Sequence, residues 1–241
     1  MTKMRICFSK TGPLRYIGHL DFLKVFQQTI RRAGLPMAYS QGFNPHMQLS
    51  FALPLPLGMV STRDYADLTL ESELPGDEIV VRLNACAPTG LCVNSAWEYS
   101  GPGAAALVMV ADYLFCGLPL EMLENQHDIE EKILYPVLSQ DSIVIPKKTK
   151  SGIKDTDIRP DIFSLSVASG ITSANTEMIQ DSQDTNILMR LAAGSGRFLS
   201  PLIVAKLLTG QDADISAIIR HDLYRQDKEK GLISLNEAPI H

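Results

Sequence analysis

The chain has 241 residues, of which 45% are hydrophobic and 20% charged, and its formal net charge is −5 at pH 7. This composition is typical of a soluble globular protein and excludes a fibrous or disordered chain. The longest apolar run, Ala104–Ala111, is far shorter than the roughly 20 residues that a membrane span needs, so we expect no membrane association. Scattered cysteines and the lack of a secretory signal predict a cytoplasmic protein with reduced thiols.

The charge is distributed unevenly along the chain. Residues 1–50 hold seven basic side chains and one acidic side chain, a net charge of +6, whereas residues 51–145 carry a net charge of −11. Such segregation predicts a positive surface on an acidic body, which suits an anionic partner.

The first hundred residues predict one compact α+β unit. An alternating segment at Met4–Phe8 ends at a Gly-Pro turn, and apolar residues spaced by three and four then predict a helix over Leu20–Ala33. The further elements are an irregular extended stretch over Met37–Leu57, a strand over Tyr65–Leu70, a helix over Glu78–Cys86 and a strand over Leu91–Tyr99. The order β-α-β-β-α-β is that of a ferredoxin-like unit, here residues 1–100.

Residues 104–210 predict a second α+β unit after a linker at Gly101–Gly103. Its elements are strands over Ala105–Phe115, Ser142–Pro146, Ile158–Val167 and Asn186–Ala192, and helices within Leu120–Leu138 and over Ser200–Leu208. We expect a loop over Ser169–Asp184, and a C-terminal tail, 211–241, with a short helix over Ile215–Tyr224. The predicted fold is therefore α+β, with two ferredoxin-like units in tandem.

The first helix begins at candidate functional residues. His19 and Asp21 lie where free backbone N–H groups can bind a phosphate, and His19 could act as a general acid or base on RNA. Alternatively, His19 caps the helix and Asp21 interacts with the helix dipole. Arg15, before the helix, and Arg31 and Arg32, in its last turn, are candidate phosphate contacts.

The segment Tyr39–His46 combines two aromatic rings, an imidazole, two amides and a hydroxyl. Single-stranded RNA is recognised by such groups, because rings stack on bases and amides read base edges. The alternative is a rigid turn set by Gly42 and Pro45, with Phe43 in the core. The candidate binding residues are Tyr39, Ser40, Gln41, Phe43, Asn44 and His46.

A second basic segment lies at Lys147–Lys154. Its lysines, followed by Arg159, are candidate contacts to a phosphate backbone, or else they mark a solvated hairpin tip. The lysines are Lys147, Lys148, Lys150 and Lys154. We expect neither a metal nor a cofactor, because the histidines and cysteines lack metal-ligand spacing and the glycines lack phosphate-loop spacing.

Several of these motifs together resemble a known family. The sequence resembles a family of radical-SAM-associated proteins of unknown function over most of residues 3–205. The segments that carry the resemblance are Gly18-His19-Leu20-Asp21, Tyr39–His46, Pro56-Leu57-Gly58, Lys150…Arg159 and Arg197…Pro201. The family pattern favours serine at the position of Gly18. Members of that family occur beside, or fused to the C-terminus of, a radical SAM protein with a cobalamin-binding-like region. The resemblance implies a radical SAM partner and an RNA-binding or substrate-presenting role.

Three functions are therefore compatible with the sequence. The first is a non-catalytic RNA-binding or substrate-recruiting accessory protein of a radical SAM enzyme. The second is a metal-independent RNA endonuclease that uses His19, since two ferredoxin-like units with such a histidine resemble CRISPR RNA-processing endonucleases in architecture. The third is a protein-interaction module in which Tyr39–His46 contacts the radical SAM partner.

Overall fold

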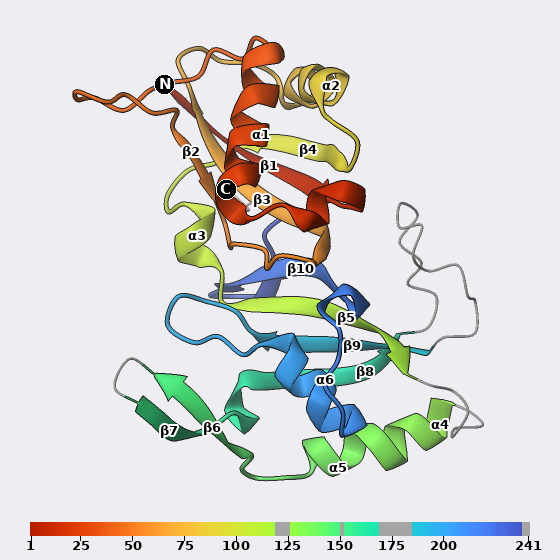
Figure 1. Ribbon diagram of the computed structural model, residues 1–241. Coiled ribbons are helices and arrows are strands. Elements are labelled where there is room, and N and C mark those ends of the chain that lie inside the picture. Colours follow the sequence, from red (N-terminus) through yellow and green to blue (C-terminus); the bar gives the residue numbers. More distant parts are fainter. Residues whose placement is uncertain (119–125, 150–151, 169–184, 238–241) are drawn as a thin grey trace.

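The computed structural model describes residues 1–118, 126–149, 152–168 and 185–237 (Figure 1). It confirms the predicted α+β class: a nine-stranded sheet carries a small number of helices, and a separate two-stranded hairpin extends from the sheet. The main path of the sheet runs in the order β4-β1-β3-β10-β5-β9-β8.

The first half of the sheet is built around β1. The strands are β1 (Thr2–Lys10), β2 (Leu49–Phe51), β3 (Val60–Leu70) and β4 (Leu91–Glu98), and the helices are a 3-10 turn (Gly12–Tyr16), α1 (His19–Arg32) and α2 (Gly76–Cys86). β1 pairs antiparallel with both β3 and β4, and β2 pairs antiparallel with β3. The predicted helices and strands of this half are confirmed. Phe8, Phe22, Phe26 and Phe51 form an aromatic core under α1, with ring centroids 5.2–5.9 Å apart.

In the second half of the sheet, as in the first, neighbouring strands pair antiparallel. Its strands are β5 (Val110–Leu118), β8 (Ile162–Ala168), β9 (Thr185–Ala192), β10 (Ile218–Asp227) and β11 (Gly231–Ser234). Its helical segments are α3 (Ala104–Leu107), α4 (Gln126–Ile129), a π-helix (Glu130–Leu134), α5 (Tyr135–Leu138), 3-10 turns at Arg159–Asp161 and Ile215–Ala217, and α6 (Pro201–Thr209). β10 with β5, β5 with β9, and β9 with β8 are all antiparallel. β6 (Val144–Thr149) and β7 (Gly152–Asp157) form the separate hairpin.

The two halves share one sheet because β3 and β10 pair in parallel, with Val60 opposite Ile219 and Ser61 opposite Arg220. Arg220 is fully buried at this junction, and its guanidinium donates to the carboxylate of Asp64 at 2.6 Å. Lys10 is buried beside them, and its Nζ donates to the carbonyl of Ile17 at 3.1 Å. The junction is therefore a packed part of the molecule with polar groups inside it.

The prediction of a helix over Ile215–Tyr224 is wrong. The segment expected to be a C-terminal tail contains a central strand of the sheet. Only Ile215–Ala217 is helical, as a 3-10 turn, and β10 follows between β3 and β5. The sequence pattern does not predict this strand, because the strand buries charged residues as well as apolar ones. Arg220 pairs with Asp64, and the carboxylate of Asp222 accepts from the Tyr65 hydroxyl at 2.5 Å.

Two predicted strands begin later than the sequence indicates. Residues Ala104–Leu107 are helical, because the Ala104 N–H donates to the Asp67 carboxylate at 2.6 Å, and β5 starts only at Val110. Ile158 precedes a 3-10 turn, so β8 starts at Ile162. The predicted loop Ser169–Asp184 lies outside the described residues.

Candidate functional site

Strand directions bring several candidate segments to one edge of the sheet. Strands β1, β5 and β8 start at the edge where β3, β9 and β10 end, because each neighbouring pair is antiparallel except β3 with β10. We call this the arm edge, because the segment 40–46, here called the arm, projects from it beside β2 (Figure 1). The loop between β9 and α6 and the β6–β7 hairpin lie on the same side of the molecule in that view.

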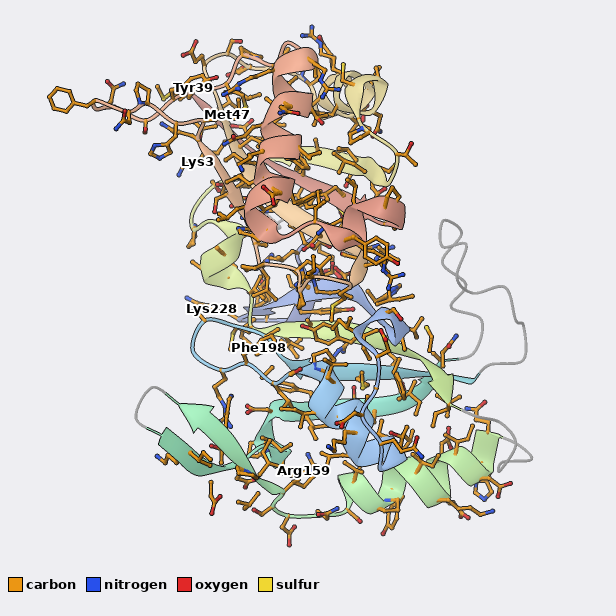
Figure 2. All side chains as sticks on the ribbon, viewed as in Figure 1. Lys3, Tyr39, Met47, Arg159, Phe198 and Lys228 are labelled. Carbon is orange, nitrogen blue, oxygen red and sulfur yellow. The ribbon has the colours of Figure 1, made fainter. Side chains whose placement is uncertain are left out.

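The arm is fixed at its base by short-range hydrogen bonds. Tyr39 and Met47 form an antiparallel bridge, and the Ser40 N–H donates to the carbonyl of His46 at 2.9 Å. The Ser40 hydroxyl also contacts Nδ1 of His46 at 2.9 Å and accepts from the His46 backbone N–H at 3.1 Å. Figure 2 shows the arm extending away from the body beyond the labelled Tyr39 and Met47. Ser40 and His46 therefore shape the arm rather than face into a cavity.

The outer part of the arm is fully open to solvent. Phe43 is 106% exposed, so the alternative that places this ring in the core is wrong. Gln41 and Asn44 are exposed, and neither side-chain amide bonds to any residue that the structure describes. Gly42 has φ of 134°, a backbone conformation that residues with a Cβ rarely adopt. The arm thus presents to solvent one aromatic ring and two side-chain amides that bond to no described residue.

His19 lies apart from the arm. It is the first residue of α1, partly buried, and its ring meets Phe51 edge-on at a centroid distance of 5.6 Å. His46 precedes Phe51 by five residues of extended chain, about 16 Å at ~3.3 Å per residue, so the two histidines are not brought together. No described residue hydrogen-bonds the His19 ring, and Gly18 caps the helix without a side-chain bond. Asp21 is exposed and pairs with Lys24 at 3.0 Å.

Two arginines predicted to contact phosphate instead hold the fold together. Arg15 is 3% exposed, and its guanidinium donates to the carbonyls of Gly58 at 2.7 Å and Ser216 at 3.1 Å. Arg159 donates to the carbonyls of Leu138 at 2.9 Å, Gln140 at 3.0 Å and Ile162 at 3.0 Å, so it caps the end of α5. Both guanidinium groups therefore donate to backbone carbonyls. The burial of Arg15 argues against a phosphate contact there, and for the partly exposed Arg159 such a contact stays a prediction.

The remaining basic candidates whose side chains the structure describes are exposed. Arg31 and Arg32 lie in the last turn of α1, which is followed by the chain that leads into the arm. Lys147 and Lys154 are directly opposite each other in the β6–β7 hairpin, which confirms a hairpin at this basic segment. Lys148 lies in β6, but its side chain and Lys150 are outside the described part of the structure.

One aromatic residue beside the hairpin was not predicted from the sequence. Phe198 is 42% exposed, and its carbonyl accepts from Nζ of Lys147 at 3.1 Å. It follows Gly194-Ser195-Gly196-Arg197, a loop that the sequence marks only by its small residues. No local sequence signal places Phe198 beside the lysines, because its contact with Lys147 joins residues 51 positions apart.

Buried ionisable groups elsewhere serve the packing of the sheet. Burial raises the pKa of the Cys7 thiol to about 12, which keeps it protonated. Burial lowers the pKa of His221, whose Nδ1 lies 3.2 Å from the Thr62 hydroxyl. Across residues 1–118, 126–149, 152–168 and 185–237, no three His, Cys, Asp or Glu residues are grouped so as to hold a metal ion.

A cavity of about 340 Å³ lies between the start of β1 and the start of α2, and its lining includes Met4, Leu74 and Trp97. None of the predicted site residues lines it. In the part of the chain that the structure describes, no helix is both long and apolar enough to span a membrane.

Comparison with known proteins places these features in a family. The family model described as an uncharacterized protein conserved in bacteria (DUF2344) matches residues 3–201, a range that contains α1, the arm, the β6–β7 hairpin and Phe198. No curated protein matches the chain.

Proposed function

We propose that this chain, which belongs to the DUF2344 family of bacterial proteins, is a non-catalytic accessory protein that binds RNA for a radical SAM enzyme. The observation that carries the proposal is the arm, where a fully exposed Phe43 lies between two amides, Gln41 and Asn44, that bond to no residue the structure describes. Burying a phenylalanine side chain contributes about 1.5–3 kcal/mol. The exposed ring of Phe43 lacks this stabilisation. A base stacked on the ring would bury it and so provide the stabilisation on binding.

Single-stranded RNA suits the chemistry of the arm. Unpaired bases stack on aromatic rings and present edges to amide groups such as those of Gln41 and Asn44. The arm itself contains no Lys, Arg, Asp or Glu, so phosphate contacts must come from neighbouring residues. Arg31 and Arg32, exposed at the end of α1, supply positive charge there.

The fold proposal is two ferredoxin-like units in tandem. Its support is that the two halves have equivalent connections. The strand order β4-β1-β3-β2 of the first half corresponds to the order β10-β5-β9-β8 of the second half. Each half follows the order strand, helix, two strands, helix, strand, with the β6–β7 hairpin inserted in the second. In this interpretation the second unit includes residues 218–227, beyond the domain limit predicted at 210.

The radical SAM partner and a cytoplasmic location complete the proposal. They are supported by the resemblance of Gly18–Asp21, Tyr39–His46 and Pro56–Gly58 to radical-SAM-associated proteins, and by the scattered, unpaired cysteines. The endonuclease alternative receives no support from the surroundings of His19, where Phe51 is the aromatic neighbour.

The test is RNA binding by the Phe43→Ala variant. Fluorescence anisotropy with a labelled single-stranded RNA of about 16 nucleotides measures the Kd at low salt. Because stacking contributes about 1–3 kcal/mol per base, we expect a Kd about 5- to 150-fold higher than that of the parent protein. Tyr16→Ala is the matched control, since Tyr16 is 72% exposed but lies in the 3-10 turn at the opposite edge of the sheet.

Two outcomes would contradict the proposal. If the parent protein does not bind single-stranded RNA at low salt, the RNA function is wrong. If Phe43→Ala leaves the RNA Kd unchanged but abolishes co-purification of the radical SAM protein, the arm is instead a protein-docking element. In the expected result, Phe43→Ala weakens RNA binding and the radical SAM protein still co-purifies.

A further inference from the structure

We infer that the arm edge is one continuous track for single-stranded RNA, with Phe198 as a second stacking ring held beside Lys147 and Lys154. This inference rests on the proposed function and extends it to a second site on the same strand of RNA. The two stacking rings would then be Phe43 at one end of the track and Phe198 at the other.

The topology of the sheet places both rings on the same edge. Phe43 is in the arm, whose base joins the end of β3 through the bridge between Met37 and Leu70. Phe198 is in the loop that follows the end of β9, where Ala193 bridges to Phe198. The β6–β7 hairpin precedes the start of β8, which is at the same edge. Figure 2 shows Tyr39 and Phe198 on the same side of the molecule.

The two ends of the track are separated by a distance that one RNA strand can span. The strands that lead to the two rings, β3 and β9, are three strand spacings apart in the sheet order, which is about 14 Å at ~4.8 Å per spacing, and the arm extends further out from the sheet (Figure 2). Proteins that bind single strands contact about 4–16 nucleotides. A single strand of about 16 nucleotides is therefore long enough to contact both rings. Two separate ligands are not required.

The hairpin end of the track carries two exposed lysines, Lys147 and Lys154. Lys147 and Lys154 are cross-strand partners, and like charges placed directly opposite destabilise a hairpin. Neither lysine forms an ion pair with any residue that the structure describes. Nζ of Lys147 lies 3.1 Å from the carbonyl of Phe198, so this charge is held next to the exposed ring. A phosphate beside Phe198 would relieve the repulsion while a base stacks on the ring.

Further lysines lie at the arm edge. Lys228 directly follows β10, which lies between β3 and β9 in the sheet order, whereas Lys3 is near the start of β1, on the other side of β3, and both are exposed. Figure 2 shows both on the same side of the molecule as Tyr39 and Phe198. The neighbouring Asp227 is paired with Arg225 and accepts from the backbone N–H of Lys230, so its carboxylate is already compensated. Lys228 therefore supplies a phosphate contact in the middle of the track, and Lys3 supplies one near the end of β3.

RNA length and a second aromatic variant test the track. Anisotropy is measured with labelled single-stranded RNAs of about 4 and about 16 nucleotides. For the longer RNA, Phe198→Ala is expected to raise the Kd about 5- to 150-fold, while Tyr135→Ala, an exposed aromatic on α5, leaves it unchanged. The longer RNA should also bind the parent protein more tightly than the shorter one, because it engages both rings at once.

The results separate the two levels of the proposal. If Phe43→Ala weakens binding of the longer RNA and Phe198→Ala does not, the arm function stands and the track is wrong. If only Phe198→Ala weakens binding, the proposed role of the arm is wrong and the track is wrong with it. If both variants weaken binding of the longer RNA, the track is supported.

Salt dependence provides a readout that does not depend on the aromatic variants. Replacing both Lys147 and Lys154 by Gln should reduce the slope of log Kd against log salt by about 1.4, since each phosphate contact on a single strand contributes about 0.7. Lys206→Gln is the control, because Lys206 is similarly exposed on α6 but pairs with Asp212 at 2.7 Å. An unchanged slope in the double variant overturns the hairpin end of the track.

Discussion

Replacement of Arg15 distinguishes a structural arginine from a phosphate contact. Its guanidinium joins the 3-10 turn before α1 to the Gly58 loop at 2.7 Å and to Ser216, just before β10, at 3.1 Å. These segments come from the two halves of the sheet. Arg15→Ala would remove both bonds and leave two carbonyls without this donor. Arg15→Lys would keep the positive charge but lose the planar group that reaches both carbonyls.

The magnitude follows from the two bonds. A hydrogen bond from a charged donor contributes about 1.5–3 kcal/mol, so two of them amount to roughly 3 kcal/mol at the lower limit. For a chain of this size about 1 kcal/mol shifts the Tm by ~2–4 °C. We therefore expect Arg15→Ala to lower the Tm by about 6–12 °C, and Arg15→Lys to lower it by a large part of that amount.

Thermal unfolding followed by circular dichroism, together with RNA anisotropy below the Tm, makes the distinction. Arg31→Ala is the control, since Arg31 is exposed at the end of α1 and its loss should change the free energy of unfolding by no more than about 0.5 kcal/mol. A stable Arg15→Ala variant with weakened RNA binding, rescued by Arg15→Lys, would refute the structural role.

Two further predictions concern buried ionisable groups. Because burial lowers the pKa of His221 in the folded protein, its contribution to stability is present above about pH 6.5 and is lost as the pH falls through its folded-state pKa. The free energy of unfolding, measured with urea, should fall less between pH 7 and pH 5 in His221→Gln, and equal slopes would contradict this. Cys7, with a pKa of about 12, should be the slowest of the four thiols to react with iodoacetamide at pH 8, as mass spectrometry of Cys7, Cys86, Cys92 and Cys116 will show.

The first half of the fold was predictable because its apolar pattern is regular. Of the apolar residues whose spacing predicted the inner face of α1, Phe26 and Ile30 are buried, whereas Leu20 is 70% exposed and Phe22 is buried in its place. Gly34 follows the helix with φ of 64°, which fits a helix end. The spacing of apolar residues along the chain was sufficient to predict an element that buries one face against a single core.

Strand β10 shows why the C-terminal part was not predictable in the same way. A central strand is buried on both faces, and here polar pairs provide part of that burial. Arg220 and Asp222 are at most 2% exposed, and each has a partner about 160 positions earlier in the chain, Asp64 and Tyr65. Such long-range compensation leaves no local signal, so the charged residues made this segment resemble a surface helix or tail.

The candidate site was predictable in composition but not in its roles. The sequence singled out the arm, and the structure shows that Phe43 is exposed rather than in the core. The sequence could not separate Arg15 and Arg159, which donate to backbone carbonyls, from Arg31, which is exposed, because that difference depends on distant backbone. It also could not place Phe198 beside Lys147, since that contact joins residues 51 positions apart.

The most direct test of the central claim is photo-crosslinking of the parent protein to a single-stranded RNA that carries 4-thiouridine, with the attachment sites located by mass spectrometry. Trypsin releases the arm within one peptide, residues 33–63, and Phe198 within another, residues 198–206. The account predicts RNA attached to the peptide that contains Phe43, and to the Phe198 peptide when the RNA is long enough to reach it. RNA attached only to peptides outside the arm edge, with none on residues 33–63, would contradict it.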